Sequence, residues 1–114
     1  MYKLIVFIPK KDTPKVKEAL FKAGAGRLGE YSDCGFETQG LGQFKPLDKA
    51  NPTIGSRGKI EYVEECKFET IVEQNSIEDV LLALYKSHPY EEPAFDLIEL
   101  ANNKFSHLKN LVKS

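Results

Sequence analysis

The sequence has no excess of charge of either sign. Its 16 Lys and Arg residues nearly balance its 17 Asp and Glu residues, which leaves a formal net charge of -1. A basic surface is the usual mark of proteins that bind nucleic acid or anionic lipid, so this balance favours neither partner. The longest purely apolar run, Leu4 to Ile8, is far too short to cross a bilayer. We therefore expect no nucleic-acid partner and no membrane partner.

Cysteine is also scarce, and a leader-like segment is missing. The two cysteines, Cys34 and Cys66, form no Cys-x-x-Cys pair, which argues against a zinc site or a thioredoxin-like redox motif. The first residues lack the long apolar stretch and small-residue cleavage site of a signal peptide. We therefore expect a cytoplasmic protein in which both thiols stay reduced.

What the chain does contain is an ordinary globular composition, with 114 residues, 41% hydrophobic and 29% charged. That length fits one domain, for which we assign residues 1–100, followed by a tail at 101–114. Residue patterns predict strands at 2–8, 60–72 and 93–100, and an extended arm at 31–44. The glycines Gly35, Gly40 and Gly42 predict bulges or bends in that arm. Pro and Gly residues predict a long loop at 45–58.

Two amphipathic helices are expected between these strands. The first begins at a capping Asp12, buries a stripe of Val16, Ala19, Leu20 and Ala23, and stops at Gly24. The second begins at Ser76, which with Asp79 approximates a capping box, and Pro89 ends it. Its apolar stripe consists of Ile77, Val80, Leu81, Leu84 and Tyr85.

The resulting order β-α-β-β-α-β predicts an α+β, ferredoxin-like fold. In that fold an antiparallel sheet carries both helices on one face, which leaves the other face for water or a partner. The tail predicts a short C-terminal helix with Phe105, Leu108 and Val112 on its inner side.

A literal G-x-G-x-x-G occurs at Gly24–Gly29, but it follows a helix instead of a strand. A dinucleotide-binding motif needs the opposite context, so a helix stop and loop is the favoured interpretation. Backbone N–H groups of this loop together with Arg27 form an alternative anion-binding nest. The carboxylates of Glu61, Glu65 and Glu69 share one parity of a strand, which is typical of a solvated face.

The segment Ser87–Pro93 is the most distinctive run of the chain. In it, His88, Glu91 and Glu92 offer nitrogen and oxygen ligands to a divalent metal such as copper or zinc. The other interpretation is a rigid helix-to-strand corner, stiffened by two prolines, in which His88 is held by hydrogen bonds. The spacing of the residues leaves both interpretations open.

Two groups of motifs resemble known families. His88–Asp96 resembles the corner of the CutA divalent-ion tolerance proteins, which are trimeric and related in shape to PII signalling proteins. A wider set resembles the YqfO-type inserted domain of the Nif-three-like (NGG-interacting factor) family over roughly residues 1–100. That set comprises Gly24–Gly29, Tyr31, Cys34, Gly40, Gly42–Pro46, Ala50–Pro52, Ile54–Gly55, Glu61–Glu65 and Glu69–Thr70.

The resemblance implies a standalone, non-enzymatic PII/CutA-like module that forms homo-oligomers, with a trimer favoured over a dimer. A small ligand or partner protein would then bind in a regulatory role, with Gly26, Arg27, Gly42 and Asn51 as candidate ligand-binding residues. One alternative is a CutA-type protein that binds a divalent metal; another is a regulatory subunit of a Nif-three-like metal-dependent hydrolase. The lobes that carry the dinuclear metal site in larger relatives have no counterpart in this sequence, so the resemblance does not imply their GTP cyclohydrolase-type activity. An enzyme acting on a nucleotide or small metabolite is the weakest alternative, since no catalytic set of residues stands out.

Overall fold

The computed structural model describes residues 1–113. Its helices and strands follow one another as β1 (Tyr2–Pro9), α1 (Thr13–Lys22), β2 (Gly35–Phe44), β3 (Glu61–Val72), α2 (Ile77–Ser87), β4 (Phe95–Glu99) and α3 (Lys109–Val112). Single 3-10 segments precede α1, α2 and α3, at Lys10–Asp12, Gln74–Ser76 and Asn102–Leu108.

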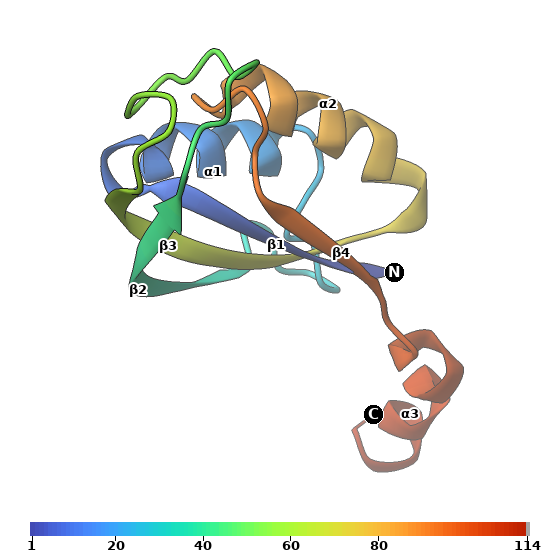
Figure 1. Ribbon diagram of the computed structural model, residues 1–114. Helices are drawn as coiled ribbons and strands as arrows, with labels where there is room; N and C mark the ends of the chain where they lie inside the picture. The colour runs from blue at the N-terminus through green and yellow to red at the C-terminus, as the bar shows by residue number, and fades with distance from the viewer. Residues whose placement is uncertain (114) are drawn as a thin grey trace.

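The four strands form one antiparallel sheet in the order β2-β3-β1-β4. Both α1 and α2 lie on the same side of that sheet, which leaves the other side uncovered (Figure 1). The predicted ferredoxin-like α+β fold is thereby confirmed. We call the uncovered side the open face; it carries the odd-numbered residues Lys3 to Phe7 of β1 and Lys67 to Ile71 of β3.

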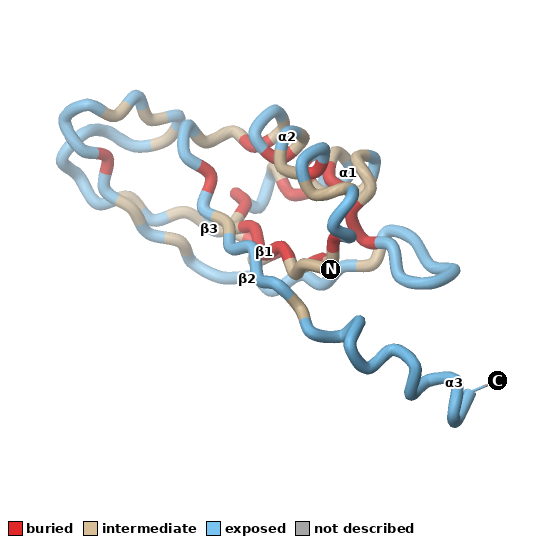
Figure 2. Tube along the Cα trace, turned by 90° about the vertical axis from the view of Figure 1, so that its right-hand side faces the viewer, coloured by how far each residue is buried: buried red, intermediate tan, exposed pale blue. Residues whose placement is uncertain are grey.

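The core lies between the sheet and the two helices (Figure 2). Even-numbered side chains from Leu4 to Ile8 of β1 and from Cys66 to Val72 of β3 point toward the helices, because successive residues of a strand face opposite sides. Phe68 is fully buried there and meets Phe21 of α1 edge-on, with ring centroids 5.6 Å apart. Each large apolar side chain of this kind contributes about 1.5–3 kcal/mol by leaving water. The other members of the core are Leu4, Val6, Ile8, Val16, Leu20, Ala25, Cys66, Val72, Val80 and Leu84.

The glycines of β2 do not mark bulges, and that prediction is wrong. The pairing of β2 with β3 runs without interruption from Gly35 opposite Thr70 to Phe44 opposite Glu61. A Cβ on Gly35 would overlap the Phe68 ring, so this glycine serves close packing instead of a bend. The register of β3 is equally regular against β1.

The hairpin of β2 and β3 extends past the end of β1. Pairing between β1 and β3 stops at Pro9 opposite Glu65, whereas β2 continues to pair with β3 as far as Glu61. The loop between Phe44 and Glu61 therefore starts beyond the helix layer and folds back toward the end of α2 (Figure 1). This overhang positions the candidate site.

The helix starts differ from the predicted caps. Neither Asp12 nor Ser76 makes a side-chain capping hydrogen bond, because a 3-10 turn leads into each helix and places the cap residue in helical geometry. The predicted stop of the first helix is confirmed. Gly24 has φ of +117°, a conformation that glycine adopts without steric cost.

The tail after β4 forms the predicted short helix but does not pack as expected. Its apolar side chains Phe105, Leu108 and Val112 are exposed, so the prediction that they face inward is wrong for the single chain (Figure 2). Leu100 N–H donates to Met1 O at 2.9 Å, which fixes the start of the tail beside the N-terminus. Ser114, the last residue of the predicted tail, lies outside the described residues.

Two further expectations concern cysteines and membranes. Both cysteines are free thiols, with Cys66 in the core and Cys34 partly exposed. Among residues 1–113, no helix combines the length and apolar content needed to cross a bilayer.

Candidate functional site

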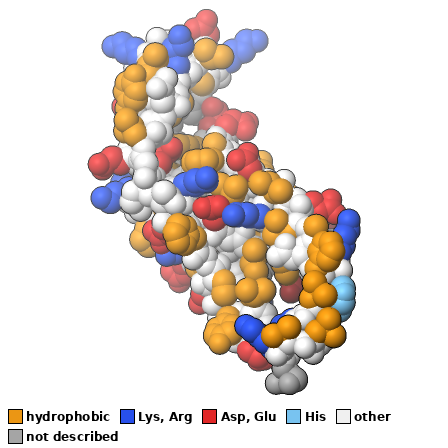
Figure 3. Space-filling view, turned by 90° about the horizontal axis from the view of Figure 1, so that it is seen from below, with side chains coloured by type: hydrophobic (Ala, Val, Ile, Leu, Met, Phe, Trp, Pro, Cys, Tyr) orange, Lys and Arg blue, Asp and Glu red, His pale blue; other side chains and the backbone are white. Residues whose placement is uncertain are grey.

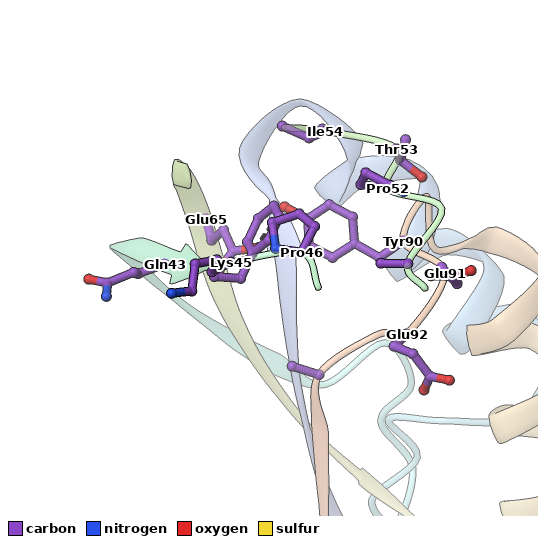
Figure 4. Close-up of a pocket in the computed structure, with 13 residues that line it drawn as sticks. Gln43, Lys45, Pro46, Pro52, Thr53, Ile54, Glu65, Tyr90, Glu91 and Glu92 are labelled. Carbon is purple, nitrogen blue, oxygen red and sulfur yellow. Dashed lines mark hydrogen bonds between the residues drawn. The ribbon is translucent and has the colours of Figure 1, made fainter. Parts of the chain in front are cut away.

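A pocket of about 270 Å³ lies at the overhanging end of the β2–β3 hairpin. The hairpin forms one wall, the loop from Lys45 to Ile54 a second, and the corner between α2 and β4 the third (Figure 4). We call it the corner pocket. Figure 4 shows the Tyr90 ring beside Pro46, with Gln43 and Glu92 directed outward. Its lining residues are Gln43, Phe44, Lys45, Pro46, Ala50, Pro52, Thr53, Ile54, Glu65, Tyr90, Glu91, Glu92 and Ala94.

His88 holds the corner in place. Pro89 disfavours helical geometry in the preceding residue, and His88 accordingly leaves α2 in an extended conformation with ψ of 136°. Its Nε2 lies 2.8 Å from Phe7 O, and Tyr90 N–H donates to its Nδ1 at 3.1 Å. Since a carbonyl oxygen only accepts, Nε2 carries the proton and Nδ1 the lone pair. Burial lowers the pKa of His88, which is consistent with this neutral imidazole.

Tyr90 and Glu65 form the polar base of the corner pocket. The Tyr90 hydroxyl donates to Glu65 Oε2 at 3.1 Å, and the Tyr90 ring meets Phe44 edge-on with centroids 5.6 Å apart. Burial raises the pKa of Glu65, although the bond from Tyr90 opposes that rise. Burial and the nearby Glu65 carboxylate raise the pKa of the Tyr90 phenol well above its usual range. The pair therefore holds a carboxylate in a partly dehydrated setting.

Gly42 gives the Glu65 side chain its position. A Cβ at Gly42 would overlap the Glu65 carboxylate, which lies flat against β2 at that point. Any larger residue would push the carboxylate away from the Tyr90 hydroxyl. Gly40, its neighbour on the same face, has open space above it and no such role.

Two hydrogen bonds attach the loop to the corner. Asn51 N–H donates to Glu91 Oε1 at 3.2 Å, and Thr53 Oγ1 donates to Pro89 O at 2.7 Å. Within the loop, Arg57 Nε donates to Ala50 O at 2.7 Å. These bonds hold the loop over the corner pocket, where it forms the second wall.

The structure brings together only some of the residues predicted to bind a ligand. Gly42 lies below Glu65 beside the corner pocket, and Asn51 is in the loop above it. Gly26 and Arg27 lie elsewhere: Gly26 N–H donates to Ile71 O at 2.7 Å, and Ile71 is at the far end of β3 from Glu65. The glycine-rich loop, a helix stop as expected, therefore does not share a site with the corner pocket in one chain.

Two of the three predicted metal ligands, His88 and Glu91, make other hydrogen bonds. Both ring nitrogens of His88 are hydrogen-bonded to backbone groups, and Glu91 accepts from Asn51. Within residues 1–113, no three His, Cys, Asp or Glu side chains are grouped so as to hold a metal ion. Copper or zinc binding by His88, Glu91 and Glu92 stays a prediction that this geometry does not favour.

Sequence reasoning missed the part played by Glu65 and Tyr90. Glu65 belonged to a set of carboxylates assigned to a solvated face, yet it is half-buried. Strand parity gives the face of this side chain correctly, but it carries no information about a distant loop that folds over the side chain. Tyr90 lay within the most distinctive motif, and its position between two prolines was the available signal.

Comparisons with solved structures place this fold in a known class. No family model matches the chain. A PII-like protein CutA from Nostoc aligns with a TM-score of 0.67 over 99% of this chain and 94% of its own, at 17% identity. At that identity the likeness concerns the fold alone, and the chain has a CutA/PII-like, ferredoxin-like fold.

Closer relatives identify the particular domain. A protein from Halalkalibacterium halodurans named GTP cyclohydrolase 1 type 2 homolog is 54% identical over 102 residues, which cover 90% of this chain and 27% of that protein. A relative of the same name from Bacillus subtilis is 48% identical over 95 residues, 83% of this chain and 26% of its own length. The crystal structure of a Bacillus cereus protein related to NIF3 aligns with a TM-score of 0.77 at 39% identity, over 89% of this chain and 26% of that one.

The chain therefore belongs, as a homologue of one segment, to the YqfO-type domain of the Nif-three-like family. It spans about a quarter of the length of these relatives.

Proposed function

We propose that this chain is a non-enzymatic, self-associating PII/CutA-like module that binds a small ligand or a partner protein in a regulatory role. The observation that carries the proposal is the apolar character of the open face. Phe36 is 67% exposed and Ile98 46% exposed on that face. They lie close to the buried Ile5 and the partly buried Phe7 and Ile71. Figure 3 views the molecule from this side and shows hydrophobic side chains interspersed with charges. Apolar surface of this kind is typical of protein interfaces.

One ion pair on the open face suits a specific interface. Lys3 Nζ and Glu69 Oε1 are 2.8 Å apart and neutralise each other beside Phe36. Paired charges at an interface set the register of the partners without leaving an unpaired ion in the contact. Likeness to CutA proteins favours a trimer, in which the open faces of three copies cover one another.

The corner pocket is the proposed ligand site of the module. It is walled by three segments of one chain, and the loop bonds to the corner keep it formed. The non-enzymatic part of the proposal is supported by His88, whose two nitrogens are bound to backbone and are not free for proton transfer. The activity in the name of the relatives concerns proteins of which this chain matches about a quarter, and we do not carry it over.

A Nif-three-like protein is the partner that the relatives suggest. In them a homologous segment lies within the same chain as other regions, which make up most of their length. As an alternative form of the proposal, this module binds the corresponding region of a separate Nif-three-like protein and regulates it.

Sedimentation velocity of two matched variants tests self-association. Phe36→Lys places a charge on the open face, whereas Leu82→Lys places one on an exposed position of α2 that is 57% exposed. We expect Phe36→Lys to sediment as a monomer and Leu82→Lys to assemble like the unmodified chain. Equal sedimentation of both variants and the unmodified chain would contradict the assembly through the open face.

A further inference from the structure

We infer that the corner pocket takes a small organic cation, an ammonium or guanidinium group attached to an apolar body. The inference rests on the proposed function, because it names the ligand class of the same pocket. It depends on three features of the pocket: its size, its apolar walls, and the carboxylate at its base.

The size and walls of the pocket suit a small apolar group. A volume of about 270 Å³ lies just below the usual range for ligand sites, roughly 300–1,000 Å³, so only a small ligand fits. Phe44 and Tyr90 supply aromatic surface, and Pro46, Pro52 and Ile54 supply aliphatic surface. A single ring or short aliphatic chain would displace water from these walls, and the burial of apolar surface favours its binding.

The charged side chains of the pocket favour a ligand with a positive charge. The lining residues carry three carboxylates and one ammonium group, that of Lys45. Glu92 is directed outward and Glu91 accepts from Asn51, so Glu65 is the carboxylate at the base. An anion would meet net repulsion there. A cation would meet attraction, strengthened by the aromatic rings, whose faces are electron-rich.

Glu65 is the group that makes a cation preferable to a neutral molecule. Its Oε2 accepts from Tyr90, whereas no side chain or backbone group among residues 1–113 donates to its Oε1. A neutral apolar ligand would dehydrate this carboxylate without replacing its lost hydrogen bonds, which costs free energy. An ammonium or guanidinium N–H donates to the carboxylate and compensates the charge, in a bond stronger than one between neutral groups.

A bare metal ion fits the same base less well. Zinc in proteins takes about four close ligands. At the base of the corner pocket Glu65 offers one carboxylate oxygen without a partner, and Glu91 already accepts from Asn51. The arrangement instead suits a ligand that makes one charged contact and many apolar ones.

Three probes of similar shape and different charge test the inference: 2-phenylethylammonium, 2-phenylethanol and 3-phenylpropionate. Each is titrated into the isotope-labelled full chain at pH 7.5, with backbone amide NMR shifts as the readout. We expect the ammonium probe to shift the amides of Asn51, Tyr90 and Glu91 and to bind at least about tenfold more tightly than the other two, a difference of about 1.4 kcal/mol. Glu65→Gln should abolish that preference, whereas Glu18→Gln, an exposed change on α1, should leave it intact.

The outcomes separate this inference from the proposed function. Equal or tighter binding of the alcohol or the carboxylate overturns the cation inference, as does binding of the ammonium probe that is unchanged by Glu65→Gln. Shifts of the same amides by Zn²⁺ alone, without any by the ammonium probe, overturn it in favour of a metal site. Absence of binding by all three probes also overturns it, yet leaves the proposed assembly standing if the chain sediments as an oligomer. A monomer that binds the ammonium probe selectively would instead refute the assembly and support the cation site.

Discussion

The hydrogen bond from Tyr90 to Glu65 offers the sharpest test of how the corner pocket is built. Tyr90→Phe removes the hydroxyl and leaves the aromatic contact with Phe44 in place. A hydrogen bond to a charged acceptor contributes about 1.5–3 kcal/mol when it is buried. Both partners are only partly buried and the bond is long, at 3.1 Å, so we expect a loss near 1 kcal/mol after allowance for solvent screening.

Urea denaturation at pH 7.5 measures that loss, with protein concentration held constant because assembly would shift the transition. Tyr62→Phe is the matched control, since Tyr62 lies on the same hairpin, is 57% exposed, and has no side-chain hydrogen bond within the described chain. We expect the control to change the free energy of unfolding by less than about 0.5 kcal/mol. In a double-mutant cycle with Glu65→Ala, the coupling energy should be about 1 kcal/mol. A coupling energy near zero, or equal losses for the two tyrosines, would refute the assigned bond.

Three further predictions concern neighbouring parts of the chain. Gly42→Ala forces the Glu65 carboxylate to move and should lower the free energy of unfolding, measured in urea, by about 1 kcal/mol. Gly40→Ala, at a position with open space above it, should lower that free energy by less than half as much. In an NMR pH titration, the pKa of the His88 ring should lie below the ordinary histidine value of 6.5, because the ring is buried. The neutral ring should carry its proton on Nε2. The variant His107→Gln identifies which signal belongs to the other histidine. The unfolded chain takes up this proton at a higher pH than the folded chain, so the free energy of unfolding should fall as the pH drops below 6.5. A free energy of unfolding that rises there, in step with the His88 titration, would contradict the burial of His88 as a neutral ring. Phe68→Ala should cost about 3–5 kcal/mol in urea denaturation because it empties a fully buried site, and a loss below 1 kcal/mol would contradict the described core.

The fold was predictable because its signals are local. The stripe that contains Val16 and Leu20 has helical spacing, and the alternation through Cys66 and Phe68 has strand spacing. Each pattern assigns one buried side, and only a layered arrangement buries all of them together. The caps were mispredicted because a 3-10 turn and a side-chain cap are alternative ways to begin a helix, and the same polar residues permit both.

The candidate site was only partly predictable because it depends on contacts between distant segments. The corner around His88 could be recognised from its two prolines, and its interpretation as a hydrogen-bonded turn agrees with the structure. The burial of Glu65 could not be recognised, since it depends on a loop that folds back onto the hairpin and is attached through Thr53 and Asn51. Likewise, the sequence shows that Gly42 is a glycine but not which side chain lies against it.

The mass of the unmodified chain in solution tests the central claim most directly. Light scattering at several protein concentrations gives that mass without any mutation or added ligand. If copies of this chain cover one another's open face, the particle should weigh three times the 12.9 kDa of a single chain and keep that mass on moderate dilution. A mass of 12.9 kDa at every concentration would contradict the account.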